Sequence, residues 1–323
     1  MNKRSFLLSS LSAALLLCAA ARPGLAQPGF PSQPIRIIVA TPPGGASDAA
    51  ARLIAQSLSK SLGQHVLVEN RTGGNGVPAI QAALAAPPDG HTLLWTMASM
   101  AGMPLLVKSS PVKSMNEFAP VLPVVNLMYG LYVSPKVPVT TVDELTAYLK
   151  ANPGKLSYAT GTLSEYMVAV HYLRSAGLKA ERIPYKGGVQ LLPDLMNGDV
   201  QFNFGPLGPA LPHVRSGKLR LLATLPERTD AAPGVPALAE RGVNTSALPI
   251  WNGLMAPPRT PREVTERIAQ EVNRVLADPA VRASLETQGF RVSGGTPQQM
   301  AEAIDSAAAV WRQFVRDYEI PQE

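Results

Sequence analysis

The sequence has few of the residues that catalysis through a nucleophile or a metal ion requires. Its 323 residues include one cysteine, Cys18, and four histidines. Because Cys18 falls within an N-terminal segment that we expect to be removed, the mature chain has no thiol, which excludes disulfides and cysteine catalysis. No two histidines lie within one helical turn of each other, so no metal site is expected. The histidines are His65, His91, His171 and His213.

Long apolar runs are also scarce, and the one that exists is N-terminal. A basic start, "MNKR", an apolar stretch, "SFLLSSLSAALLLCAAA", and small residues before Gln27 are typical of a signal peptide covering residues 1–26. The stretch is too short for a membrane span, and no other apolar run of that kind follows. The sequence therefore predicts a protein that is exported to the periplasm.

Charge is modest, with 16% charged residues and a net charge of +6. Residues 1–26 hold three basic residues and no acid, so the mature chain has 26 Lys and Arg against 23 Asp and Glu, a net charge of +3. No dense basic run remains, and the aromatic residues do not alternate with basic clusters, so nucleic-acid binding is not expected. The 46% of hydrophobic residues predicts a globular chain with a substantial core.

Strand-like and helix-like segments alternate in the first third of the mature chain. This βαβαβ order predicts a parallel sheet. A long extended stretch at 118–135 contains no helical pattern, and we expect it to pass from one lobe to another. The expected strands are 35–40, 65–70 and 91–97, and the expected helices are 47–63 and 78–90.

A second βα series follows the extended stretch. It predicts an α/β protein of two lobes, each of which starts its own βα series. The expected strands are 156–160, 182–185, 200–204, 219–225 and 251–258, and the expected helices are 141–154, 164–176, 188–197, 207–216, 261–277 and 297–318.

The stretch "ATPPGGASDAAARLIAQSL", residues 40–58, raises three functional interpretations. A nucleophile elbow needs glycine two residues before and after the serine, but Ser47 has Gly45 before it and Ala49 after it. A phosphate loop needs a lysine that is missing here. A separate stretch, "GGNGVPA" at 73–79, resembles a dinucleotide-binding fingerprint. It is interrupted by Pro78 and has no acid at the distance of a ribose partner, so dinucleotide binding is not expected.

The third interpretation is an anion site, in which the backbone amides of residues 44–46 precede a helix N-terminus. The structural alternative is a turn in which Ser47 or Asp48 only caps the helix. Two similar elements, "SYATGTLSEYM" at 157–167 and "IPYKGGVQLLPDL" at 183–195, lie in the other lobe. Together the three loops predict a clamp for a small carboxylate.

At these residues the chain resembles the Bug (TctC) family, the periplasmic solute-binding proteins of tripartite tricarboxylate transporters. The resemblance covers residues 33–318. It implies a type II periplasmic-binding-protein fold of two α/β lobes joined by crossing strands, with lobe I at 27–126 plus 226–323 and lobe II at 127–225. Such a fold closes over a carboxylated solute and delivers it to the membrane subunits of the transporter. We expect no cofactor, no catalysis, because no nucleophile–base pair or metal site is present in the sequence, and a monomer. The stretches that carry it include "PIRIIVATPPGGASDAAARLIAQSLSKSLGQHVLVENRTGGNG", "PPDGHTLL", "IPYKGGVQLLPDLMNGDVQF", "SGKLRLLAT" and "WNGLMAPPRTP".

Ligand-binding residues follow from this resemblance position by position. They are Pro43, Gly44, Gly45, Ser47, Asp48, Thr160, Gly161, Ser164, Tyr185, Lys186 and Gly187, to which the backbone amides of 44–46 and 160–162 add Ala46 and Thr162. We expect Asp48 to orient its loop more than to contact the solute. The chain departs from the family pattern at Leu163, Met167, Glu165 and Gly205, which leaves the choice of solute open.

Two other functions stay open beside solute uptake. A solute sensor that reports to a regulator or to another permease is the alternative, and a secreted serine hydrolase using Ser47 is disfavoured. The tryptophans Trp95, Trp251 and Trp311 are expected in the core, with Trp95 the one placed to reach the cleft from a strand end.

Overall fold

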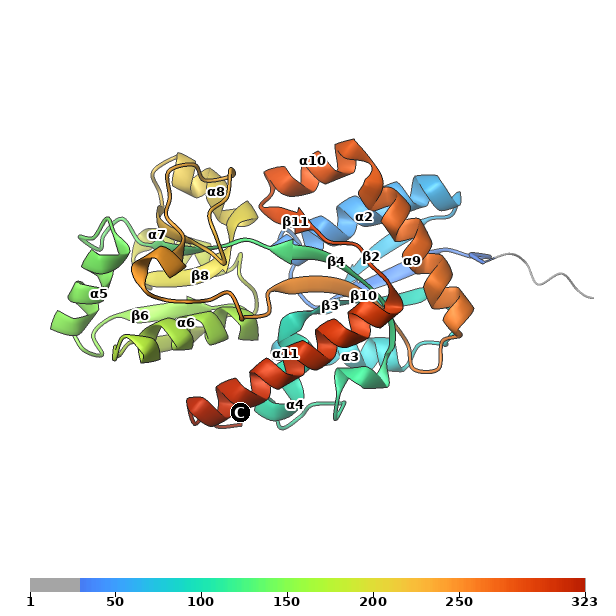
Figure 1. The fold of residues 1–323 in the computed structure, drawn as a ribbon, viewed down its shortest axis with the longest axis horizontal. Coiled ribbons are helices and arrows are strands. Elements are labelled where there is room, and N and C mark those ends of the chain that lie inside the picture. The colour runs from blue at the N-terminus through green and yellow to red at the C-terminus, as the bar shows by residue number, and fades with distance from the viewer. Residues whose placement is uncertain (1–29, 323) are drawn as a thin grey trace, which may run out of the picture. The chain divides into compact units, whose positions relative to one another are not determined.

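The computed structural model describes residues 30–322, so the expected signal peptide lies outside the described residues (Figure 1). Within the described residues, eleven strands form two sheets. The first sheet has the order β11 (Phe290–Val292), β4 (Ala119–Leu127), β10 (Trp251–Ala256), β3 (Thr92–Met97), β1 (Ile35–Val39) and β2 (Val66–Asn70). The second has the order β7 (Glu181–Pro184), β6 (Ser157–Thr160), β8 (Phe202–Pro206), β5 (Tyr129–Val133) and β9 (Arg220–Leu225).

Both sheets mix parallel and antiparallel strands. Strand β1 runs parallel to β2 and β3, and β6 runs parallel to β7 and β8, as the βα order predicts. Strand β10 is antiparallel to β3 and β4, and β5 is antiparallel to β8 and β9. The prediction of an α/β fold with two lobes is confirmed. The parallel sheet predicted for the βαβαβ segment is present in β1, β2 and β3, and β4, β10 and β11 join it later in the chain in antiparallel register.

The chain crosses between the sheets twice. Only Met128 separates β4 in the first sheet from β5 in the second, so the extended stretch at 118–135 does pass between lobes, as predicted. The return runs from β9 to β10 through residues 226–250. The amide of Leu127 donates to the carbonyl of Ile250 at 2.9 Å, which joins the two crossings beside each other.

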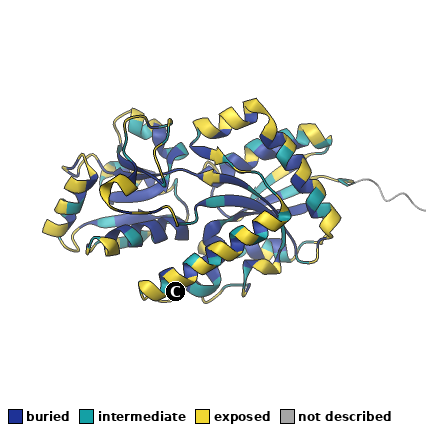
Figure 2. Ribbon diagram, viewed as in Figure 1, coloured by how far each residue is buried: buried dark blue, intermediate teal, exposed yellow. Residues whose placement is uncertain are grey.

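Helices pack on the sheets with one face buried and the other exposed (Figure 2). The elements α4, α10 and β11 were not predicted, and α10 was missed because the Asp278-Pro279 pair that caps and starts it was not recognised as a helix start. No helix among residues 30–322 is long and apolar enough to cross a membrane.

The helices are α2 (Ala46–Leu62), α3 (Val77–Leu84), α4 (Met103–Leu106), α5 (Val142–Ala151), α6 (Leu163–Ser175), α7 (Leu192–Asn197), α8 (Leu207–Arg215), α9 (Arg262–Ala277), α10 (Pro279–Thr287) and α11 (Pro297–Asp317), with short 3₁₀ turns η1 (Gly74–Gly76), η2 (Ala98–Gly102), η3 (Met115–Glu117) and η4 (Leu238–Arg241).

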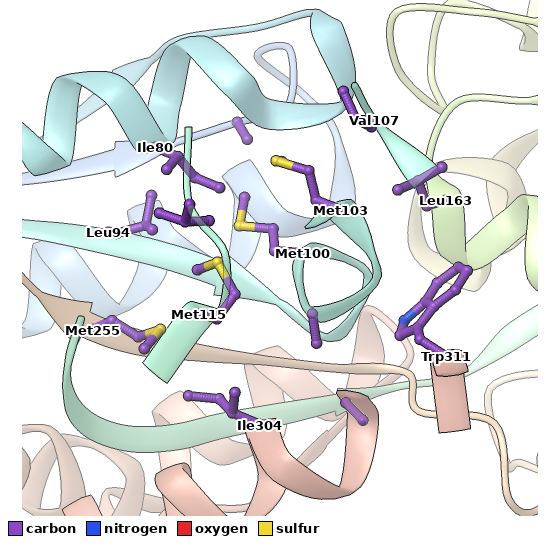
Figure 3. Close-up of a cluster of buried hydrophobic side chains, with 14 of the residues drawn as sticks. Ile80, Leu94, Met100, Met103, Val107, Met115, Leu163, Met255, Ile304 and Trp311 are labelled. Carbon is purple, nitrogen blue, oxygen red and sulfur yellow. The ribbon is translucent and has the colours of Figure 1, made fainter. Parts of the chain in front are cut away.

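A large apolar cluster links α11 and the first sheet to α6 (Figure 3). Trp311 is fully buried in it and donates from Nε1 to the carbonyl of Ala98 at 3.2 Å. Leu163 and Met167, two of the departures from the family pattern, are buried in the same cluster. Their side chains therefore fill apolar space in this cluster.

Candidate functional site

A pocket of about 660 Å³, part of it open to solvent, lies between the two sheets. It is lined by residues that follow β1, β3 and β6 and by residues of β8, at the carboxyl ends of the parallel strands. Ligands of open α/β sheets bind at this end of the strands. Both sheets contribute to the lining, so the pocket belongs to neither lobe alone.

On the side of the first sheet, the pocket is lined by the start of α2. Gly45 is the N-cap of α2, and Ala46 and Ser47 lie in its first turn. The backbone amides of a first turn have no hydrogen-bond acceptor within the helix. The buried Ser47 hydroxyl accepts a hydrogen bond from Nδ2 of Asn252 at 3.1 Å. Its own hydrogen therefore stays free to be donated into the pocket.

The expected anion site at residues 44–46 is smaller than the sequence suggests. The amide of Gly44 donates to Oδ2 of Asp48 at 2.9 Å, and the amide of Gly45 donates to the carbonyl of Pro42 at 3.2 Å. Gly44 has a φ of 81°, in the left-handed region that favours glycine, so its role is to make the turn. The predicted donation of these two amides to a solute is therefore wrong, because both have acceptors within the protein.

Asp48 holds this turn together. Its buried carboxylate accepts hydrogen bonds from Arg52 at 2.9 Å and from Nδ2 of Asn70 at 2.8 Å, besides the one from Gly44. Burial acts to raise the pKa of Asp48, but these hydrogen bonds outweigh it and hold the pKa below its ordinary value. Asp48 does not line the pocket, which agrees with a loop-orienting role.

Replacing Asp48 with Asn should destabilise the protein more than it affects binding. The amide lacks the negative charge that pairs with Arg52, and one of its two polar atoms cannot accept a hydrogen bond. We expect the free energy of unfolding to fall by about 2 kcal/mol in urea titrations. Equal stability of the variant and the wild type would contradict the role assigned to Asp48.

On the side of the second sheet, the start of α6 repeats this arrangement. Thr162 is the N-cap and accepts a hydrogen bond from the amide of Glu165 at 3.2 Å. The amide of Gly161 donates to Oε2 of Glu165 at 2.6 Å, so it too is used within the protein and is not the solute donor that was predicted. Thr162 and Ser164 line the pocket.

Glu165 also lines the pocket, and it is 1% exposed. Burial raises its pKa to about 7, although hydrogen bonds from Gly161, Asn203 and Thr162 act in the opposite direction. Gly205, another departure from the family pattern, lines the same pocket, and a Cβ there would lie 2.6 Å from Oδ1 of Asn203. Two of the departures from the family pattern thus line the pocket.

Two buried polar atoms of the lining have no hydrogen-bond partner within residues 30–322. They are Oγ1 of Thr41 and Oδ1 of Asn252. Buried polar atoms in folded proteins nearly always have partners, and each orphan costs about 1–3 kcal/mol. Both atoms face the pocket with unused hydrogen-bonding capacity.

The predicted site residues fall into three groups in the structure. Gly45, Ala46, Ser47, Thr162 and Ser164 line the pocket. Thr160, Gly161, Thr162, Tyr185 and Lys186 line a neighbouring hollow that also includes Arg182. Pro43, Gly44, Asp48 and Gly187 line neither.

Gly187 instead brings the loops of the two lobes together. A Cβ at Gly187 would lie 2.4 Å from Cδ and 2.6 Å from Cγ of Pro42. Pro42 follows β1 of the first sheet, whereas Gly187 follows β7 of the second. The two loops are therefore in direct contact.

Sequence reasoning missed several lining residues on the strands themselves. Asn252 and Asn203 are buried polar residues inside apolar strands, "WNGLMA" and "FNFGP", and this interruption was the signal that could have found them. Trp251 lines the pocket, whereas Trp95 is fully buried and does not. The suggestion that Trp95 reaches the cleft is therefore wrong.

Two α/β lobes with helix N-termini at a shared pocket define a two-lobed solute-binding protein. A sequence model of the family described as "Tripartite tricarboxylate transporter family receptor" matches residues 50–320. The chain belongs to this family, as the resemblance implied. Members of the family are solute-binding proteins and not enzymes, and similar solved structures include a periplasmic transporter and the periplasmic binding protein BugD.

Individual relatives are similar to this chain over nearly its whole length. Protein BugT of Bordetella pertussis is 34% identical over 294 residues, which cover 89% of this chain and 90% of BugT. The structure of the periplasmic binding protein BugD has a TM-score of 0.85 and 25% identity, covering 91% of this chain and 100% of BugD. The structure of Rpa4515 of R. palustris with adipate has a TM-score of 0.87 and 26% identity, again covering 91% and 100%.

Proposed function

We propose that this protein captures a small carboxylated solute in the pocket between its lobes and delivers it to the membrane subunits of a tripartite tricarboxylate-type transporter. The observation that carries the proposal is the meeting of two helix starts, α2 and α6, in one buried pocket with unpartnered polar atoms. The structure of Rpa4515 with adipate supports the carboxylate class. Residues 1–26 act in this proposal as the signal peptide that directs the chain to the periplasm.

In this proposal the first turn of α2 is the main carboxylate contact. The amides of Ala46 and Ser47 point to where the partial positive charge of the helix end is largest. The hydroxyls of Ser47 and Ser164, and that of Thr41, add donors from both lobes. Water bridges extend their reach, because a bridged hydrogen bond is nearly as favourable as a direct one.

Closure of the lobes completes the site. Lobe I, 27–126 plus 226–323, and lobe II, 127–225, each supply part of the lining, so the solute makes all its contacts only when they come together. The contact between Pro42 and Gly187 belongs to this closed arrangement. Small-angle scattering should show compaction when a binding carboxylate is added, and an unchanged radius at saturation would count against closure.

Ser47→Ala tests the site itself. The change removes a donor to the solute, and we expect a roughly tenfold loss of affinity for carboxylates, equivalent to about 1–2 kcal/mol. Isothermal titration with a panel of small carboxylates measures it, and mass spectrometry of solute released from periplasmically purified protein identifies the natural one. Ester or amide turnover that disappears in the variant would overturn the proposal in favour of a hydrolase.

Delivery to a transporter needs its own assay. Uptake of labelled solute by vesicles that contain the two membrane subunits should require this protein. Uptake that proceeds equally well without it would leave a sensor as the better interpretation.

A further inference from the structure

Two carboxylates occupy equivalent positions at the two helix starts. Asp48 in α2 and Glu165 in α6 each lie four residues after a loop glycine and accept its amide hydrogen, at 2.9 Å from Gly44 and 2.6 Å from Gly161. Both side chains are almost completely buried. The two helix starts are thus built alike, and the difference between them lies in what surrounds each carboxylate.

Only Asp48 is balanced by a positive charge. Arg52, one turn further along α2, forms an ion pair with it at 2.9 Å. The equivalent position of α6 is the buried Ala169. Among residues 30–322, no Lys, Arg or His side chain pairs with Glu165, and none lines the pocket. Glu165 is therefore the one charged side chain of the pocket lining, and its counter-charge is not supplied by the protein.

This difference makes the two ends of the pocket unlike. A helix N-terminus carries roughly half a positive charge. At α2 that partial charge remains available for an anion, because Asp48 and Arg52 cancel each other. At α6 an ionised Glu165 carries a full negative charge that exceeds the partial charge of the helix, so a cation that enters this end of the pocket is attracted to Glu165 and favours its ionised form. The orphan Oδ1 of Asn252 adds an acceptor to the lining.

We propose that the solute is a zwitterion, with a carboxylate at the start of α2 and a cationic nitrogen that pairs with Glu165. The substrate class is accordingly the aminocarboxylates, including N-substituted ones, and not the dicarboxylates. This inference rests on the proposed function, because it assigns the second functional group of a solute whose first is the carboxylate. The reason for a cationic group is that an ionised carboxylate in the pocket is stabilised by a positive charge, and the lining contains Glu165 but no Lys, Arg or His side chain.

Matched solutes of equal length test the inference. ω-Aminocarboxylates with chains of three to six carbons, and α-amino acids, supply the zwitterions. Methyl-terminated acids and dicarboxylates of the same length replace the ammonium by a neutral or negative group, and primary alkylamines omit the carboxylate. We expect isothermal titration to show at least ~10-fold tighter binding of the best aminocarboxylate than of its methyl-terminated and dicarboxylate counterparts.

Glu165→Gln is the decisive variant, because it keeps the size of the side chain and one oxygen that can accept the hydrogen bond from Gly161, and it removes the charge. It should lose about 10- to 30-fold in affinity for aminocarboxylates and gain affinity for dicarboxylates. Asp48→Asn is the matched control at the equivalent position of α2, outside the pocket lining. It should keep the wild-type order of preference.

The outcomes separate the inference from the proposed function. Tighter binding of dicarboxylates than aminocarboxylates by the wild type, or an unchanged preference in Glu165→Gln, would overturn the zwitterion and leave carboxylate capture standing. If alkylamines bind as tightly as aminocarboxylates, the carboxylate group does not contribute to binding. That result would overturn the proposed carboxylate capture and leave the pairing of a cation with Glu165 standing. Binding of no probe in any series would overturn both.

Discussion

Gly187→Ala is expected to lower the affinity for the bound carboxylate by ~100-fold while leaving the protein folded. The added Cβ would lie 2.4 Å from Cδ of Pro42, a separation that non-bonded carbon atoms do not reach. Because the two residues belong to loops of different lobes, opening the lobes relieves the clash. Gly187 is not among the glycines with positive φ, so alanine fits its backbone conformation.

The second change that tests this explanation is Pro42→Ala in the same chain. It removes Cγ and Cδ, the atoms that the new Cβ meets, and should restore most of the affinity that Gly187→Ala loses. Gly161→Ala is the control for a clash within one lobe, because its Cβ would lie 2.3 Å from the backbone of Gly187 and Gly188. That variant should have a lower melting temperature. A Gly187→Ala protein with wild-type affinity in calorimetric titration would show that the Pro42 contact is not part of the bound state.

The second large effect concerns the pH dependence of stability. The pKa of Glu165 is about 7 in the folded protein and 4.5 in its ordinary state, so between these pH values the folded protein binds more protons than the unfolded chain. The free energy of unfolding therefore falls as pH rises from 4.5 to 7. Relative to Glu165→Gln, the ligand-free wild type should lose about 3 kcal/mol across this window.

Few other groups disturb this measurement. Tyr129 on β5 is the titratable neighbour of Glu165, and burial and the Glu165 charge raise its pKa, so it stays neutral throughout the window. Asn203 on β8 and Thr162 do not titrate. Urea unfolding at several pH values between 4 and 8 supplies the comparison, and parallel stability curves for the wild type and Glu165→Gln would contradict the expected difference.

Asp48→Asn should show the opposite slope. The pKa of Asp48 is lowered in the folded protein, so the stability it contributes is present above its ordinary pKa of 3.8 and is lost as pH falls. The difference between the wild type and this variant therefore grows as pH rises from the acid side. Two similar carboxylates at equivalent positions thus predict opposite pH dependences.

The sequence was sufficient to predict the elements that carry the α2 side of the site. The apolar run at 35–40, the glycine turn and the helix that follows are local patterns, and the structure contains them as β1 and α2. The crossing at 118–135 was also predictable, because an extended stretch of that length without a helix does not fit one strand of a compact sheet. These features depend on neighbouring residues in the chain.

The partners of the polar groups were not predictable in the same way. The bond between Ser47 and Asn252 joins residues 205 positions apart. It exists because β10 enters the first sheet antiparallel to β3 after the chain has built the whole second sheet. Likewise, the sequence identified Glu165 as an extra acid, but its burial depends on how α6 packs against the second sheet.

The position of Trp251 has an optical consequence. Of the three tryptophans, Trp95 and Trp311 are fully buried, whereas Trp251 is partly exposed and lines the pocket. An indole emits at wavelengths set by the polarity around it, so two of the three fluorophores are insulated from the pocket and one is not. The protein thus carries an intrinsic reporter of occupancy, whose emission responds to a bound solute without any attached dye.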